Sequence, residues 1–180
     1  MPISGYNDRL PDDILVNTGV VYVGNSPMGV SRGGLNFDPA AEMRNVEYDG
    51  KLAPVKGLDR KVYVAPVISG RMLQLGPEDI VRYDPGIVNT GPDTTFTPKD
   101  AGVFLAAGDY LTNLRLVFER SGGGFAQVRF PVALCVRYAI AGTDRSEGEV
   151  DCAFEARRDP AVQTAEGDLP YIIELLDTIS

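Results

Sequence analysis

Two alternating runs joined by a glycine cluster constrain the fold more than any other feature of this sequence. Residues 110–119 and 125–140 alternate apolar and polar side chains, and the sequence SGGG at residues 121–124 separates them. A period of two is typical of a half-buried β-strand, and a short glycine-rich connection between two such runs is typical of a hairpin. The sequence therefore predicts an antiparallel hairpin, followed by a third half-buried strand at residues 147–157.

The length and composition favour one mainly β domain over residues 1–180. The chain has twenty glycines, thirteen prolines and a hydrophobic fraction of 44%. Such a composition suits short strands joined by turns and can supply one continuous core. We predict a β-sandwich with one short flanking helix, which begins after Gly76 because Pro77, Glu78 and Asp79 suit a first helical turn.

Three further segments are predicted to be extended. Residues 14–23 and 28–37 lie at hairpin distance from each other, so we predict that they pair as an opening antiparallel unit. Residues 61–69 read as one strand in which Pro66 marks an edge or a bulge. Residues 171–176 are too apolar for a loose tail, and we expect them to be buried.

A long charged segment separates these elements. Residues 40–60 mix charges of both signs with turn residues, and we predict a protruding loop or β-arm in which residues 44–48 are extended. Compact domains rarely carry so long a connection unless it has a function. Its candidate contact residues are Glu42, Arg44, Glu47, Asp49, Lys51, Lys56, Asp59 and Arg60.

The two cysteines are predicted to be free thiols. In the run from residue 128 to residue 140 the apolar side chains occupy the even positions, which places Cys135 on the polar face. Cys152 belongs to the apolar face of its own strand. Opposite orientations make a disulfide geometrically awkward.

The sequence lacks the residues that several classes of protein function require. The sequence has no histidine, which excludes histidine-dependent triads, dyads and zinc sites, and it has no phosphate-binding loop motif. The net charge of −8 gives no basic footprint for nucleic acid. Asp84, Asn89 and Asp93 do not match a calcium-loop spacing. We expect no enzyme activity, catalytic residues, cofactor, metal or membrane span.

Residues 16–73 carry a resemblance to a known family. The sequence GVSRGG at residues 29–34 is followed by VEYDGKLAPVKGLDR at residues 46–60, with an Asp-Gly turn and a Pro-x-Lys-Gly element. In these residues the chain resembles the tail tube (major tail) proteins of bacteriophages with long non-contractile tails. The resemblance covers about a third of the chain.

The resemblance implies a structural subunit of the virion tail, assembled in the host bacterial cytoplasm. Subunits of this family form stacked hexameric rings whose strands close into a β-barrel around a conduit for DNA. It implies residues 40–60 as the inter-ring loop, and as partners the chain itself, a tape-measure protein, a tail terminator and distal tail or baseplate proteins. DNA would pass without tight binding, and the candidate lumen-facing acids are Glu147, Glu149, Asp151 and Glu155.

Two other readings remain open. The chain could instead be a tail completion, terminator or baseplate hub protein that shares the tube fold, or a subunit of a contractile-tail or type VI secretion tube. Outside this class, a carbohydrate-binding or hydrolytic β-sandwich that uses surface carboxylates remains the weaker alternative. Self-polymerisation separates the tube subunit from a completion, terminator or hub protein and from the carbohydrate-binding alternative.

Overall fold

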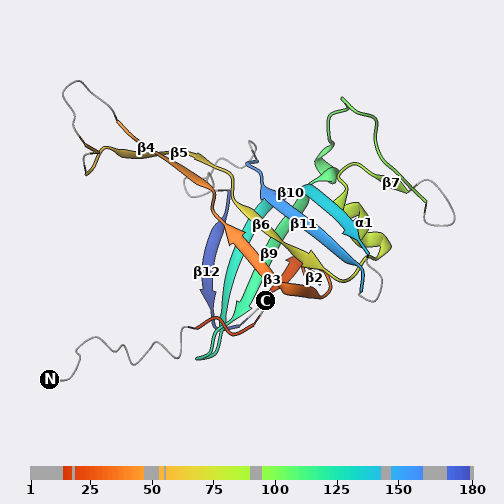
Figure 1. Ribbon diagram of the computed structural model, residues 1–180, viewed down its shortest axis with the longest axis horizontal. Helices are drawn as coiled ribbons and strands as arrows, with labels where there is room; N and C mark the ends of the chain where they lie inside the picture. Colours follow the sequence, from red (N-terminus) through yellow and green to blue (C-terminus); the bar gives the residue numbers. More distant parts are fainter. Residues whose placement is uncertain are drawn as a thin grey trace.

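Most strands belong to one antiparallel sheet, which confirms the mainly β class (Figure 1). The computed structural model describes residues 14–17, 19–46, 53–54, 56–89, 95–142, 147–159 and 170–178. The main sheet has eight strands in the order β2-β1-β9-β10-β11-β6-β3, and β12 pairs with β10 beside this path. These strands are β1 (Val20–Val23), β2 (Ser26–Pro27), β3 (Ser31–Asp38), β6 (Val67–Met72), β9 (Leu111–Glu119), β10 (Phe125–Ala141), β11 (Glu149–Ala156) and β12 (Ile172–Leu176).

Two short ribbons and one helix complete the described structure. β4 (Ala41–Asn45) pairs with β5 (Asp59–Val64), and β7 (Val88–Asn89) pairs with β8 (Phe96–Thr97). The predicted helix is confirmed as α1 (Pro77–Tyr83). The Asp79 carboxylate accepts a hydrogen bond from the Gly76 N–H at 2.9 Å, which satisfies one of the free donors at the helix start.

The predicted hairpin and third strand are confirmed. β9 and β10 pair on either side of the glycine turn, and β11 pairs with the second half of β10. In β11, Val150, Cys152 and Phe154 are buried, while Glu149, Asp151 and Glu155 lie on the opposite face and are only partly buried. These elements were predictable because neighbouring segments of the chain form them.

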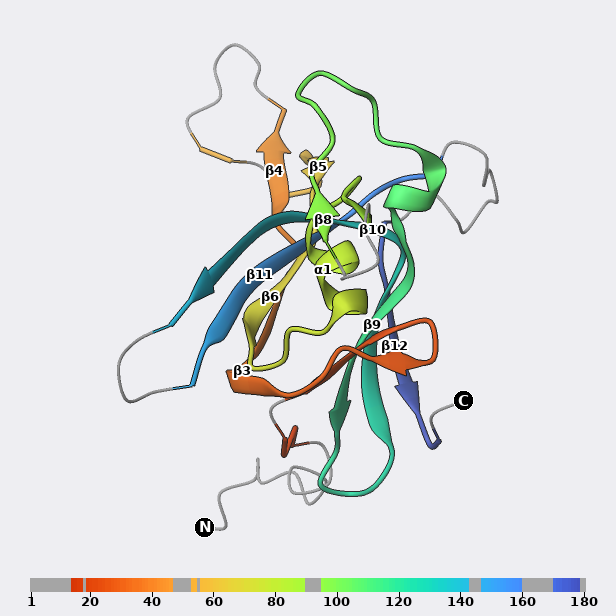
Figure 2. The same cartoon turned by 90° about the vertical axis from the view of Figure 1, so that its right-hand side faces the viewer.

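The main sheet bends over its own core instead of forming two separate sheets. Phe37 on β3 lies 6.1 Å from Phe130 on β10, ring centroid to centroid, although β11 and β6 separate these strands in the sheet order. Figure 2 shows the bend, with β6 and β11 on one side of α1 and β9 and β12 on the other. Tyr83 of α1 packs between Tyr138 and Phe154 at this opening. Over the described ranges the strands do not close into a barrel.

The alternation of β10 changes face near its middle. Val132 pairs with Thr112 and Phe130 with Leu114, but the position between them, Pro131 opposite Asn113, is missing from the ladder. Pro131 has no N–H to donate, and Asn113 adopts a φ of 56°, which asparagine tolerates better than most residues. Both strands therefore twist together at this point.

The prediction that Cys135 lies on the polar face is wrong because of this twist. Up to Phe130 the even residues of β10 face the core, but beyond Pro131 the odd residues Ala133 and Cys135 do so. A count of alternating residues cannot detect such a shift. The two cysteines are free thiols, as predicted, and both are buried.

The buried thiols should resist modification and weaken the fold at high pH. Burial raises the pKa of Cys135 from 9.0 to about 11, and that of Cys152 to about 12. The unfolded thiols lose their protons first, so this stability is intact below pH 9 and is lost as the pH rises through the folded pKa values. Each thiol should lower the unfolding free energy by up to about 1.4 kcal/mol per pH unit in that window.

Chemical denaturation between pH 8 and pH 12 measures this effect, with thiol labelling at pH 8 beside it. Both cysteines should label slowly in the native protein and rapidly after unfolding. A variant that carries Cys135→Ala and Cys152→Ala should lose stability less steeply with pH. Equal slopes for the variant and the parent protein would contradict the assignment.

The predicted pairing of residues 14–23 with residues 28–37 is wrong. β1 pairs with β2 on one edge and with β9 on the other, whereas β3 pairs with β6 at the far end of the sheet. The last contact of this segment with β1 is at Met28, whose N–H donates to the Val21 carbonyl and whose side chain is fully buried. The prediction of one strand at residues 61–69 is also wrong, because buried Pro66 separates β5 from β6.

Candidate assembly surfaces

The first candidate surface is the charged ribbon, defined as β4, β5 and the described residues between them. It projects from the main sheet (Figure 1). The Asn45 side-chain amide donates to Asp59 Oδ1 at 2.7 Å, and the Val46 N–H donates to the Leu58 carbonyl at 2.9 Å. The segment predicted as a loop or β-arm therefore forms a paired ribbon between residues 41–46 and 58–64.

Five of the eight predicted contact residues lie on this ribbon and are exposed: Glu42, Arg44, Lys56, Asp59 and Arg60. The other three, Glu47, Asp49 and Lys51, lie outside the described residues. Arg44 pairs directly opposite Arg60, and like charges at opposed positions of a ladder repel each other. In the described part of the chain, neither arginine has a carboxylate within ion-pair distance. Among its described residues, the ribbon thus presents two arginines that form no ion pair.

The ribbon also exposes apolar side chains. Met43 on β4, Val62 on β5 and Val46 beyond β4 are all exposed. An isolated two-stranded ribbon is marginally stable in water unless a third element packs against it. A ribbon of this kind gains stability when a partner covers it.

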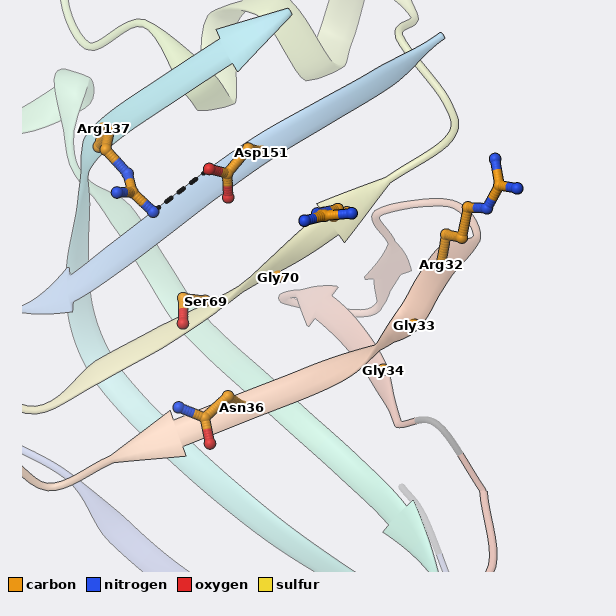
Figure 3. Close-up of a pocket in the computed structure, with 9 residues that line it drawn as sticks. Arg32, Gly33, Gly34, Asn36, Ser69, Gly70, Arg137 and Asp151 are labelled. Carbon is orange, nitrogen blue, oxygen red and sulfur yellow. Dashed lines mark ion pairs between the residues drawn. The ribbon is translucent and has the colours of Figure 1, made fainter. Parts of the chain in front are cut away.

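The second candidate surface is the outer face of β3, β6, β11 and the second half of β10, which we call the paired-charge face. It contains all four acids predicted to face a lumen, and each lies within ion-pair distance of an arginine. Figure 3 shows Arg137 and Asp151 pointing toward each other from β10 and β11. The ion pairs are Arg32 with Glu147 (3.1 Å) and Glu149 (3.1 Å), Arg71 with Glu149 (3.5 Å), Arg137 with Asp151 (3.4 Å), and Arg157 with Glu155.

These pairs change the electrostatic argument for the four acids. Four carboxylates face four arginines, so the face carries balanced charge instead of the surplus negative charge that the sequence suggested. Two of the arginines come from distant parts of the chain: Arg32 is 115 residues from Glu147, and Arg71 is 78 residues from Glu149. A hollow of about 400 Å³ lies on this face, with Gly33, Gly34 and Ser69 among the residues that line it (Figure 3).

The third candidate surface is the β12 edge, defined as Ile173, Leu175 and the edge of β12 that faces away from β10. Ile173 pairs with Val128, and Leu175 pairs with Ala126. Both side chains therefore lie on the sheet face that carries buried Val128, yet they are 59% and 68% exposed. Within the described ranges no strand pairs with the other edge of β12.

The expected burial of residues 171–176 is wrong for these two side chains. Tyr171 does pack against Phe37, at 5.3 Å between ring centroids, but the strand continues past the cover of the core. The sequence holds a signal for this, because Ile172, Ile173, Leu175 and Leu176 place aliphatic side chains on both faces of one strand. A strand at the rim of a single sheet can bury only one of those faces.

The remaining sequence expectations concern ions and membranes. The Asp84 carboxylate accepts a hydrogen bond from the Tyr138 hydroxyl at 3.0 Å, and Asp93 lies outside the described residues. Where the structure describes side chains, no cluster of three or more acidic or cysteine residues could hold a metal. Among the described helices, none combines the length and the hydrophobicity that a bilayer crossing requires.

Compared with models of known protein families, the sequence matches none, and it matches no curated protein.

Proposed function

We propose that this chain is the repeating structural subunit of a bacteriophage tail tube, in which rings of subunits stack into a conduit for DNA. The observation that carries the proposal is the β12 edge. Two large aliphatic side chains stand exposed on a strand whose outer hydrogen-bonding edge has no partner strand among the described residues. The motif at residues 46–60, which resembles that of tail tube proteins, supports the same function.

An open strand edge is a ready template for another chain. It presents unpaired N–H and C=O groups, and strand addition from a neighbour satisfies them. Within the described residues the main sheet has another unpaired edge at β3, so the edges at β12 and β3 are formed by different strands. A contact between unlike edges of successive copies is heterologous and closes into a ring when the rotation permits. We propose that rings of this protein form in this way and that they are hexameric.

The charged ribbon is suited to contacts between rings. Its arginines at positions 44 and 60 lack acidic partners among the described residues, and its apolar side chains lack cover. Charged groups at an interface fix register and reject wrong partners more than they add affinity. We propose that the ribbon packs against the next ring, where acidic groups would meet these arginines.

The paired-charge face bears on the passage of DNA. An arginine already engaged by a carboxylate is a weaker anchor for a phosphate than a free one, because the local charges cancel. We propose that this face lines the lumen and that its neutrality, in place of net repulsion, keeps DNA from adhering. Proposed partners are the tape-measure protein, the tail terminator and the distal tail or baseplate proteins. The proposed location is the virion tail, and the proposed role includes no catalysis.

Electron microscopy of the purified protein across a concentration series tests the proposal. We expect hollow rings or stacked tubes whose lumen accommodates a DNA duplex, with and without a crowding agent. A protein that stays monomeric up to its solubility limit under both conditions would contradict the tube function. Isolated rings that never stack would point to a terminator or a hub protein.

A further inference from the structure

A polar hollow of about 440 Å³ lies on the sheet face opposite the core, which is also the face opposite the exposed side chains of Ile173 and Leu175. It is formed by β9, β10 and β12 together with the turn after β1. Its walls include the side chains of Arg115, Gln127 and Arg129, which alternate with the core residues of the same strands and therefore point away from the core. Although this face is polar, the side chains of Arg115 and Gln127 are more than nine-tenths buried.

The charged groups of the hollow each have partners among neighbouring residues. The Arg115 guanidinium donates to the Gly24 carbonyl at 2.6 Å and to Asn25 Oδ1 at 3.2 Å, and it lies over the Tyr22 ring. The Arg129 Nε lies 3.6 Å from Glu174 Oε2. Among the described residues that line the hollow, two arginines and one glutamate give a surplus of positive charge.

Two buried acceptors lack hydrogen-bond partners in this hollow. The Gln127 side chain is 4% exposed, and its Nε2 donates to Glu174 Oε2 at 2.7 Å. An ionised carboxylate can only accept, so this bond fixes the amide orientation and leaves Gln127 Oε1 as the unpaired atom. Asn113 Oδ1 is also buried without a partner. Buried acceptors without partners are uncommon and costly in native proteins.

The chemistry of the missing ligand follows from these groups. It must donate two hydrogen bonds, one to Gln127 Oε1 and one to Asn113 Oδ1. The local positive charge disfavours an ammonium or guanidinium donor, and it favours a ligand whose own acceptor faces Arg115 and Arg129. A neutral NH2 group attached to a carbonyl meets both requirements. We propose that this hollow binds a primary carboxamide, such as an asparagine or glutamine side chain presents.

This proposal goes beyond the tube function and does not depend on it. Nuclear magnetic resonance of the 15N-labelled protein, kept below the concentration at which it assembles, tests it by titration with N-acetyl-glutamine methylamide. The side-chain signals of Gln127 and Arg115 should shift saturably. The glutamate and methionine analogues, which keep the length but lack the NH2 group, should bind roughly tenfold more weakly because a donor is lost.

Variants separate the pocket from general stability. Asn113→Gly removes the Oδ1 acceptor and tolerates the positive φ, so it should fold and bind the amide roughly tenfold more weakly. Asn36→Ala removes an exposed amide from β3 and should leave binding unchanged. The same spectral shifts on raising the protein concentration alone, without added amide, would assign the carboxamide to a second copy of the chain.

Three results would overturn the proposal. One is the absence of saturable shifts with the amide. A second is equal binding of the glutamate and methionine analogues. The third is a crystal structure, soaked with the amide, in which an ordered water bridges Gln127 Oε1 and Asn113 Oδ1 and is not displaced.

Discussion

The double variant Ile173→Glu and Leu175→Glu should remain folded and lose the ability to assemble. Both side chains are exposed in the monomer, so their replacement removes little from the core. In an assembled ring they would be covered, and two buried carboxylates on an edge strand oppose strand addition strongly. The critical concentration for assembly should rise roughly a hundredfold or more, since central apolar contacts often contribute several kcal/mol to binding.

Sedimentation velocity and electron microscopy measure this effect, and circular dichroism reports the fold. The matched control is Val103→Glu with Phe104→Glu, which places the same charges at exposed apolar positions in a loop away from strand edges. The control should assemble like the parent protein. If the β12 variant assembles normally, the β12 edge is not the subunit contact.

Phe154→Ala should produce the largest loss of stability in the monomer. The ring is 1% exposed and lies 6.1 Å from Tyr83, where α1 covers the opening of the bent sheet. Truncation of a buried phenylalanine removes transfer free energy and leaves a cavity, at a cost of about 3 to 5 kcal/mol. For a domain of this length the melting temperature should fall by roughly 6 to 20 °C.

Differential scanning calorimetry measures the change, and Phe104→Ala supplies the matched control. Phe104 is 96% exposed, so the same truncation there should alter the unfolding free energy by no more than about 0.5 kcal/mol. Equal melting temperatures for the two variants would show that Phe154 is not a central contact of the core.

The elements that the sequence predicts well are those formed by neighbouring segments. The glycine turn, the hairpin around it and the helix after Gly76 depend on residues that are close to one another in the sequence. Their signals are alternation, turn chemistry and a proline at the first helical position. Such signals are local, so tertiary structure does not alter them here.

The features that the sequence misses depend on contacts between distant segments. β3 leaves its neighbour β1 and pairs with β6, although a short separation in sequence favoured the nearer partner. The four acids of β11 and the segment before it were predictable as an exposed row, but their arginines were not, because Arg32 and Arg71 reach them only through the sheet order. The sequence thus predicted the position of these acids and missed their neutralisation.

No pattern in the sequence indicated the polar hollow. Gln127 and Arg115 occupy polar positions of alternating strands, which normally indicates a solvated face. They are buried because the turn at Gly24 lies close to Arg115 and β12 lies beside Gln127. Both contacts join parts of the chain that are more than forty residues apart.

The twist at Asn113 and Pro131 also limits how this chain can change in length during evolution. Up to Phe130 the even residues of β10 face the core, and between the twist and the register shift after Cys135 the odd residues do so. A deletion of one residue within β10, on either side of the twist, would move core-facing side chains to the opposite face of the sheet. Length changes should therefore accumulate in the connections, and homologues of this protein should keep the spacing between Phe130 and Cys135 even where the side chains themselves diverge.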